Sequence, residues 1–382
     1  MNDLSAQALL HRIRDDIEVG PAPVARVMQA GARRRKAHRA AWVAGLTAAC
    51  LAGAGLVGAL HHPDDRGITE TPNPANITWW GDGVLHLERV EVRTPQPEVM
   101  VSVRDGVVLW ARSTTGVQPE PVVYVDESGA TTTIGHKSWS SPLASDPATG
   151  WVAWVEATRS APPILVVYDT EADREVGRRE LTERGPRWEV MDEGSYPIAI
   201  EDGQVFFAAQ DGDYRWDVAS GSEPERVTDV GTYLHDEEAG VELVVPYDPK
   251  RGYGDVVIRR PGSPDVTIGT DGASRLSPDG RYAVATSYDG TSRPALYDAI
   301  TGDRLETGTE GRPVLAATFG PDNTLTYVIG TPPEPTSPDE GIGPFFTKMP
   351  GPPYELVTCH IATASCETVA GEIGGPGVVL SD

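Results

Sequence analysis

The feature that most constrains the fold is a unit that recurs about every 43 residues along most of the chain. Each unit opens with a tight turn and continues into a short apolar strand. The turns begin at Asp105, Thr149, Asp202, Ala239, Asp279 and Asp322. This period is typical of four-stranded blades arranged in a ring. We therefore expect an all-β fold, a β-propeller, over residues 79–382.

The blade count follows from the length of this region. Residues 79–382 hold about seven periods, although only six units are visible. The hairpin Val84–Val92 completes a seventh blade if it joins the C-terminal strand Gly377–Leu380. Mixing both ends of the chain in one blade closes the ring and leaves no free sheet edge. We favour seven blades, with six or eight as alternatives.

The second half of the unit also repeats. Three strands end with an aromatic residue and an aspartate, in Tyr168-Asp169, Trp216-Asp217 and Tyr297-Asp298. An Asp side chain at this position starts a turn by accepting hydrogen bonds from the backbone that follows it. After the last of these turns, the charged segment Asp303–Glu306 suits the exposed outer edge of a blade, where charge discourages pairing between sheets.

These turns carry a family resemblance. Leu276–Val284 reads LSPDGRYAV and resembles the Ser-Pro-Asp-Gly turn of WD-like propellers of the TolB type. Phe319–Asn323 is a degenerate copy, and Trp216-Asp217 is similar to the Trp-Asp pair of WD repeats. The resemblance covers residues 79–382. It implies the propeller fold and transfers no catalytic residue.

Ahead of the repeats lies an uncharged stretch of membrane-spanning length. Ala40–Leu60 has no charge, Asn, Gln or Pro. As a helix it would be roughly 31 Å long, which matches the hydrocarbon thickness of a bilayer. A basic cluster abuts only one of its ends, and consists of Arg33, Arg34, Arg35, Lys36 and Arg39. This asymmetry predicts a cytoplasmic N-terminus and a C-terminal domain outside the cytoplasm.

Other interpretations of this stretch fit less well. A buried core helix would not need basic residues at one end only. A cleaved signal peptide has a shorter apolar core and a shorter leader than the 39 residues found here. A lipoprotein signal at Cys50 would leave ten further apolar residues after the cysteine. We therefore expect an uncleaved, single-pass anchor in the cell membrane, followed by an extended polar linker over 61–78.

The segment 1–39 is too short to form a core of its own. Its basic cluster suits the anionic surface of a membrane. Alternatively, the segment is an amphipathic docking element that folds on a cytoplasmic partner. The layout of residues 1–60 resembles membrane-anchored proteins that actinobacteria encode beside extracytoplasmic-function sigma factors. The zinc-type anti-sigma signature is absent, since His11 and His38 have no nearby Cys.

Charge and cysteines bear on partners and compartment. The net charge of −24 makes nucleic acid a poor partner for the chain, because acidic protein and phosphate repel. Cys359 and Cys366 flank the turn of the last hairpin and would face each other across the ladder. Opposed residues of an antiparallel pair lie within disulfide reach. We expect a structural disulfide there, which an oxidising exterior permits.

No motif of catalysis, metal binding or cofactor binding emerges from the sequence. The charged segment Asp211–Asp213 is interpreted as a hairpin tip rather than a calcium site. We expect no catalytic, metal or cofactor residues, and the leading hypothesis is a non-enzymatic propeller that binds an envelope ligand or protein. An envelope enzyme is the alternative if His136, His235 and carboxylates converge at the channel mouth. A passive scaffold is the third hypothesis.

One insertion stands apart from the repeat. Residues 331–353 form a Pro-rich loop with Phe345 and Phe346 near its middle. Loops of this length are usually functional or disordered. The paired aromatic residues are candidates for a partner contact, with packing back onto the propeller as the alternative.

Overall fold

Short alternating apolar strands separated by turn residues give an all-β structure in a computed structural model of the chain. The compact unit is Asp64–Asp382. The structure describes 69–70, 73, 75, 77–111, 120–137, 142–158, 161–181, 196–209, 212–228, 231–248, 250, 252–269, 274–285, 294–309, 311–320, 323–331, 351–375 and 377–381. Within these residues no helix combines the length and hydropathy that crossing a membrane requires.

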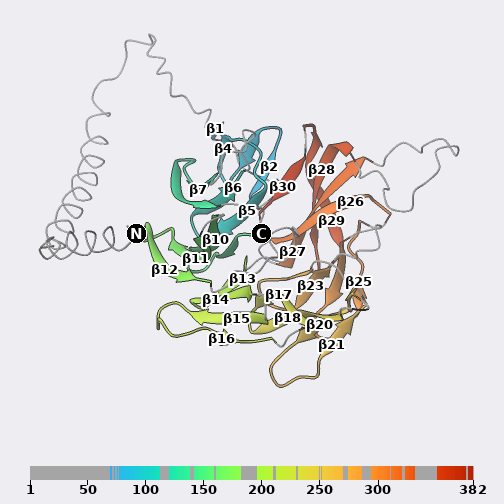
Figure 1. The fold of residues 1–382 in the computed structure, drawn as a ribbon. Helices are drawn as coiled ribbons and strands as arrows, with labels where there is room; N and C mark the ends of the chain where they lie inside the picture. The colour runs from blue at the N-terminus through green and yellow to red at the C-terminus, as the bar shows by residue number, and fades with distance from the viewer. Residues whose placement is uncertain are drawn as a thin grey trace, which may run out of the picture. The chain divides into compact units, whose positions relative to one another are not determined.

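The described strands form seven antiparallel sheets, which are the blades of one ring (Figure 1). Blade 1 consists of β30 (Val378–Leu380), β2 (Trp79–Gly81), β3 (Val84–His86), β4 (Val90–Arg93) and β1 (Thr69–Glu70). Blade 2 consists of β5 (Val99–Val103), β6 (Gly106–Trp110), β7 (Glu120–Asp126) and β8 (Thr131–Lys137). Blade 3 consists of β9 (Ala144–Asp146), β10 (Trp151–Thr158), β11 (Ala161–Asp169) and β12 (Arg174–Glu180).

The remaining four blades follow in chain order. Blade 4 consists of β13 (Tyr196–Glu201), β14 (Gln204–Ala209), β15 (Gly212–Asp217) and β16 (Glu225–Arg226). Blade 5 consists of β17 (Thr232–Glu238), β18 (Val241–Asp248), β20 (Val256–Arg259) and β21 (Val266–Ile268), with β19 (Gly252–Tyr253) beside β18. Blade 6 consists of β22 (Ser274–Leu276), β23 (Tyr282–Ala285), β24 (Ala295–Asp298) and β25 (Arg304–Leu305). Blade 7 consists of β26 (Val314–Gly320), β27 (Thr324–Thr331), β28 (Gly351–His360) and β29 (Ser365–Ile373).

Blade 1 joins the two ends of the propeller. The C-terminal strand β30 is its innermost strand and pairs with β2, with Trp79 opposite Leu380. Ser381 N also donates to Thr78 O at 3.1 Å. The seven-bladed ring and its mixed closure are therefore as predicted. The described part of the predicted linker 61–78 belongs to this blade, because β1 pairs with β4.

The recurring turns have the conformations that their residues favour. Asp202 and Gly203 have φ of 48° and 77°, which suits a two-residue hairpin turn with left-handed geometry. In the Ser-Pro-Asp-Gly turn, Ser277 Oγ accepts from Tyr282 N at 2.9 Å, and Gly280 N donates to Ser277 O at 2.7 Å. A Cβ at Gly280 would lie 2.9 Å from Glu238 O of the neighbouring blade, so this position has no room for one.

The predicted aspartate turns are also present. Asp169 Oδ1 accepts from Ala172 N at 2.7 Å, and Asp217 Oδ1 accepts from Ser220 N at 3.0 Å. These turns connect the third and fourth strands of their blades. They lie at the same end of the ring as the turns between the first and second strands.

The core lies between the faces of adjacent blades. One cluster joins Val108 and Trp110 of blade 2 to Val152 and Trp154 of blade 3, and all four side chains are fully buried. Each such side chain contributes about 1.5–3 kcal/mol when it leaves water. Since every blade packs against two neighbours, the ring depends on its closure.

The disulfide predicted at the last hairpin is present. Cys359 and Cys366 are paired across β28 and β29, with Cα atoms 4.0 Å apart. Cys366 Sγ also lies 3.1 Å from Thr307 O of the preceding blade. The bond therefore closes the hairpin where blade 7 meets blade 6.

Several predicted segments lie outside the described residues. They are the tail 1–39 with its basic cluster, the span 40–60, and the loop residues Phe345 and Phe346. What the sequence predicts of their structure and roles stays a prediction.

Candidate functional site

The innermost strands of the seven blades surround a cavity of about 740 Å³ at the channel mouth. It opens at the end of the ring where first and second strands are joined. Its lining includes apolar side chains of blades 3, 4 and 6, among them Ala144, Ile198, Ile200 and Leu276. A concave site with an apolar floor and a few convergent polar groups is the usual form of a ligand pocket.

One side of the cavity carries hydroxyl groups, and we call it the hydroxyl wall. It consists of Ser102 from blade 2, Thr318 from blade 7 and Ser381 after β30. The Ser102 and Ser381 hydroxyl oxygens lie 2.8 Å apart, and Thr318 Oγ1 donates to Ser381 O at 3.0 Å. These bonds link three blades where the ring closes. The hydroxyl wall is thus a structural seam.

The other side carries carboxyl groups, and we call it the acidic wall. It consists of Asp146 from blade 3, Glu201 from blade 4, and Asp236 and Glu238 from blade 5. A β-bulge places the last two, because the pairing of β17 with β18 shifts between Leu234 and Asp236. The extra residue interrupts the alternation of side chains between the two faces of β17, so Leu234 packs in the core while Asp236 lines the cavity.

Two of these carboxylates are engaged by backbone groups. Asp236 Oδ2 accepts from Leu276 N at 2.7 Å and thereby joins blade 5 to blade 6, while Oδ1 accepts from Glu237 N at 3.0 Å. Asp146 Oδ1 accepts from Ala148 N at 2.8 Å within its own turn. Both side chains are less than a tenth exposed. They are structural members of the wall.

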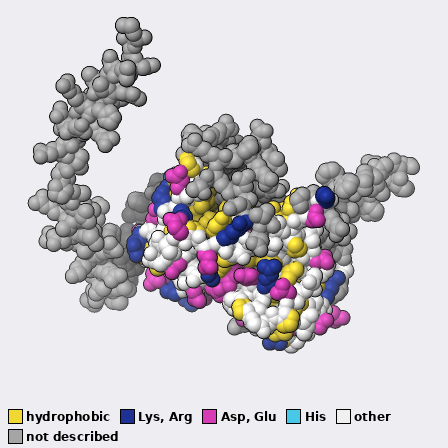
Figure 2. All heavy atoms as spheres, turned by 60° about the horizontal axis from the view of Figure 1, so that its bottom comes forward, with side chains coloured by type: hydrophobic (Ala, Val, Ile, Leu, Met, Phe, Trp, Pro, Cys, Tyr) yellow, Lys and Arg dark blue, Asp and Glu magenta, His cyan; other side chains and the backbone are white. Residues whose placement is uncertain are grey.

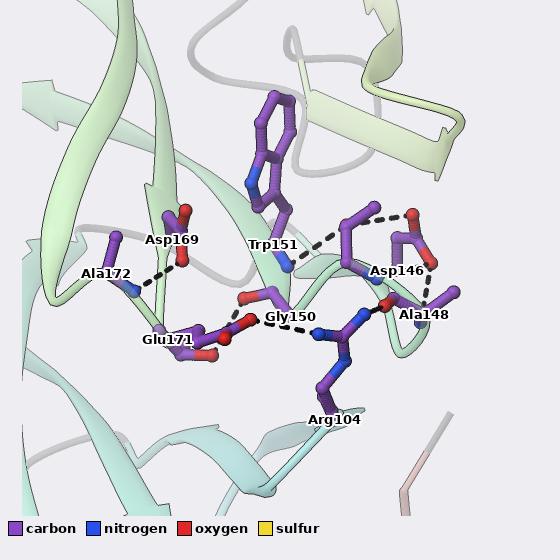
Figure 3. A network of polar contacts seen from close by, with 10 residues as sticks. Arg104, Asp146, Ala148, Gly150, Trp151, Asp169, Glu171 and Ala172 are labelled. Carbon is purple, nitrogen blue, oxygen red and sulfur yellow. Dashed lines mark hydrogen bonds and ion pairs between the residues drawn. The ribbon is translucent and has the colours of Figure 1, made fainter.

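Figure 3 shows the turn that positions Asp146. Arg104, from the first turn of blade 2, donates to Glu171 Oε2 at 2.9 Å and also contacts Ala148 O. Thr170 Oγ1 donates to Gly150 O at 2.8 Å. The contacts of Arg104 join the rim of blade 3 to blade 2, and the Thr170 bond joins two turns of blade 3.

The glutamates of the acidic wall are held in an environment that disfavours their charge. Burial, together with the carboxylates of Asp236, Glu201 and Asp146, raises the pKa of Glu238 to about 8. Glu237 lies behind the wall and is only 4% exposed. Burial, a hydrogen bond with Glu201 and nearby carboxylates raise the pKa of Glu237 to about 9. Both carboxyl groups therefore retain protons at neutral pH.

Among the described residues, the basic side chain that lines the cavity belongs to Arg275 of blade 6. Its Nη1 lies 3.9 Å from Asp236 Oδ1. His235 lies beside it, and burial together with the Arg275 charge lowers the pKa of His235 to about 4. His235 Nδ1 is 3.3 Å from Ser274 Oγ, but neither residue lines the cavity. This contact joins blades 5 and 6 and does not present a nucleophile to the site.

The channel mouth brings together some of the residues considered in the sequence and not others. Carboxylates converge there, as the enzyme alternative requires, whereas His136 is exposed on the outer strand β8 of blade 2. The interpretation of Asp211–Asp213 as a hairpin tip is wrong for Asp213, which is 1% exposed. Asp213 Oδ2 accepts from Thr228 Oγ1 at 3.0 Å and from Leu234 N at 2.5 Å, because it joins blade 4 to blade 5.

Charges of both signs are mixed on the surface of the ring. Figure 2 shows Asp and Glu side chains interspersed with Lys and Arg over the face in view. Among the described residues, no group of three or more His, Cys, Asp or Glu has an arrangement that could hold a metal ion.

Sequence reasoning did not identify the acidic wall. Its signal was the run of three acidic residues Asp236–Glu238 at the end of an inner strand, just before the Ala239-Gly240 turn. A second signal was Glu201 before the corresponding turn Asp202-Gly203 of blade 4. Inner strands end at the channel mouth in every blade, so equivalent positions converge there.

No protein-family model matches the chain, and no curated protein matches it. Among solved structures, an acylaminoacyl peptidase from Pyrococcus horikoshii is similar over 76% of this chain and 48% of its own, at 10% identity and a TM-score of 0.51. The propeller domain of the Trilobed protease from Pyrococcus furiosus is similar over 76% and 86%, at 14% identity and a TM-score of 0.49. TolB from Acinetobacter baumannii is similar over 62% of each chain, at 14% identity and a TM-score of 0.41. The chain thus spans about half of the peptidase, and the likeness to it supports the propeller fold alone.

Proposed function

We propose that the chain is a single-pass membrane protein that displays its propeller outside the cytoplasm, where the channel mouth binds an envelope ligand. The observation that carries the binding role is the cavity of about 740 Å³ lined by two contrasting polar walls. The observation that carries the placement is the uncharged segment 40–60 with basic residues at one end. The tail 1–39 would report ligand occupancy to a cytoplasmic partner, such as a sigma factor.

The binding role is supported by the way the site is built. Its polar groups come from rigid inner strands, and bonds between blades hold both walls in place. A rigid, pre-formed site binds without the loss of conformational freedom that ordering a loop requires. The propeller fold itself is compatible with many functions, so the argument rests on this cavity.

Placement is tested with a protease on intact cells. The full chain carries one epitope tag at each end. We expect added protease to remove the C-terminal tag and to leave the N-terminal tag intact. A variant that lacks residues 40–60 is the control, and both of its tags should be protected. Protection of the C-terminal tag in the unaltered chain would overturn the placement.

The binding role is tested by filling the cavity. Ser145 lies on β9 and lines the cavity, so Ser145→Trp should occupy it. Thr133→Trp makes the same change on the exposed outer strand β8. We expect a low-molecular-mass envelope extract to raise the melting temperature of the unaltered chain and of Thr133→Trp only. An equal shift in the Ser145→Trp chain would contradict the proposal.

The raised pKa values favour a second candidate, an envelope enzyme. A carboxyl group that retains its proton near neutral pH can act as a general acid, and Glu238 presents one to the cavity. The two candidates differ in the fate of the bound molecule. A binding protein leaves the bound molecule unchanged. An enzyme changes its mass, and Glu238→Gln would abolish that change.

A further inference from the structure

The acidic wall contains carboxyl groups that have no ion pair with a basic residue of the described protein. Asp146 and Asp236 are engaged by backbone N–H groups. Glu201 and Glu238 lie on the cavity surface, and neither forms an ion pair with a Lys or Arg among the described residues. The wall therefore has two carboxylates engaged by backbone groups and two, at the cavity surface, that lack a basic partner among the described residues.

A buried carboxyl group behind the wall is incompletely bonded. Glu237 is 4% exposed, and within the described residues its Oε2 has no hydrogen-bond partner. Its carboxyl group hydrogen-bonds with that of Glu201, which lines the cavity. Burying a polar atom without a hydrogen-bond partner is unfavourable. Glu201 therefore links this buried carboxyl group to the cavity surface, where an entering donor can bond to Glu201.

The charge in the cavity is one-sided. Among the described residues, the four carboxyl groups of the acidic wall, together with those of Glu88 and Asp202, line the cavity with one guanidinium group, that of Arg275, which lies near Asp236. Water is a poor substitute for a counter-charge in a partly enclosed site, where the effective dielectric constant is low. Glu201 and Glu238 are thus placed to receive a cation.

We propose that the acidic wall binds an organic cation with N–H donors, such as an alkylammonium or guanidinium group, through Glu201 and Glu238. This inference rests on the cavity being the ligand site of the proposed function. An N–H donor matches carboxyl groups, which accept charge-assisted hydrogen bonds strongly when ionised. The opposite hydroxyl wall is already bonded within the protein and offers no comparable attraction.

The shape of the cavity favours an organic cation over a metal ion. A volume of about 740 Å³ is far larger than a bare ion requires. Apolar side chains, including Ile198, Ile200 and Leu276, lie beside the acidic wall. They would bury the hydrocarbon part of a ligand whose charged end reaches the glutamates. The ligand class is therefore an amine or guanidine with an attached apolar chain.

The probe is agmatine, which carries a primary ammonium group and a guanidinium group on a four-carbon chain. The full-length chain, purified in detergent, is titrated at pH 8 by calorimetry. We expect one site, and at least a 10-fold weaker affinity in the double variant Glu201→Gln, Glu238→Gln. Glu127→Gln, on an exposed turn of blade 2, is the matched control and should bind as the unaltered chain does.

Three further probes identify the chemistry. Tetramethylammonium has the charge without N–H donors, 1,4-butanediol has the chain without the charge, and Ca²⁺ is the metal. We expect none of them to bind with the affinity of agmatine. Equal binding of tetramethylammonium or Ca²⁺, or no binding of agmatine by the folded chain, would overturn the inference.

The pH dependence provides an independent readout. Glu238 is faced by Asp236 of its own strand, Glu201 of β13, Asp146 of β9 and Arg275 of β22. Bound cation should displace protons from this group, so the measured enthalpy at pH 7 should depend on the ionisation enthalpy of the buffer. An enthalpy independent of buffer, together with unchanged affinity in Glu238→Gln, would place agmatine elsewhere.

Failure of this inference can be separated from failure of the proposed function. If the envelope extract stabilises the double glutamine variant as it does the unaltered chain, and Ser145→Trp abolishes the shift, the cavity binds a ligand that is not cationic. If Ser145→Trp has no effect on the shift, the proposed function itself is wrong.

Discussion

The hydroxyl wall and the acidic wall belong to one cavity, but they are completed differently. On the hydroxyl wall, the polar groups of Ser102, Thr318 and Ser381 bond to one another or to backbone. On the acidic wall, Asp236 is similarly engaged, whereas Glu201 and Glu238 have no basic partner among the described residues. A polar surface that bonds within itself stabilises the fold. One that presents carboxyl groups without a basic partner is suited to an external partner.

The largest expected effect comes from a deletion that removes the structural seam on the hydroxyl wall. Deletion of 377–382 eliminates β30, the innermost strand of blade 1, together with Ser381. The edge of β2 then loses its partner, and the ring is no longer closed. We expect the melting temperature to fall by on the order of 10 °C or more, measured by circular dichroism. Deletion of Asp382 alone should have little effect, and a near-normal melting temperature in the longer deletion would show that closure is dispensable.

The next effect concerns the structural part of the acidic wall. Asp236→Ala leaves the N–H groups of Leu276 and Glu237 without the acceptor that they now share. We expect a loss of about 3 kcal/mol in the free energy of unfolding, measured with urea. Glu127→Ala, on an exposed turn, should change stability by less than about 0.5 kcal/mol. If Asp236→Ala stabilised the chain, this residue would belong with the carboxyl groups without a basic partner rather than the structural ones.

A third prediction uses pH to separate the two glutamates with raised pKa values from the other carboxyl groups. The folded pKa values of Glu237 and Glu238, about 9 and about 8, lie above their unfolded values near 4.5. The folded chain therefore binds more protons between these limits, and its stability falls as pH rises toward 9. His235, whose pKa is lowered to about 4, acts in the opposite direction and reduces stability below about pH 6.5.

Glu238→Gln should remove part of the alkaline slope. The variant cannot lose a proton at this position, so its melting temperature should exceed that of the unaltered chain by about 3 °C at pH 9. At pH 5 the two chains should differ little, because Glu238 is then protonated in the folded state. Melting curves from pH 5 to pH 9 make the comparison, and parallel pH profiles would contradict it.

The fold could be predicted from the sequence because its signals are local. The turns at Asp202-Gly203 and Ser277–Gly280 adopt the conformations that their residues favour wherever they occur in a blade. Repetition of these turns gave the period, and the period gave the blade count. The disulfide was predictable for the same reason, since Cys359 and Cys366 are separated by a single short turn.

The acidic wall could not be predicted because it is assembled from distant segments. Glu201 and Glu238 come from different blades, and the direction of Asp236 depends on a bulge that the sequence does not announce. Asp213 illustrates the same limit, since a residue in a charged segment is buried by contacts with the next blade. Charge in a sequence does not reveal whether the group faces water, a neighbouring blade or a channel.

The smallest expected effect sharpens the comparison most directly, because it separates stability from binding. Ser102→Ala removes one hydroxyl of the seam and leaves the Ser381 hydroxyl without this partner. We expect a loss of about 1 kcal/mol in the free energy of unfolding. Agmatine affinity should be unchanged, since the hydroxyl wall is bonded within the protein and does not hold the cation. Urea denaturation and calorimetry on the same preparation measure both quantities. A loss of affinity comparable to that in the Glu201→Gln, Glu238→Gln variant would mean that the two walls act as one site.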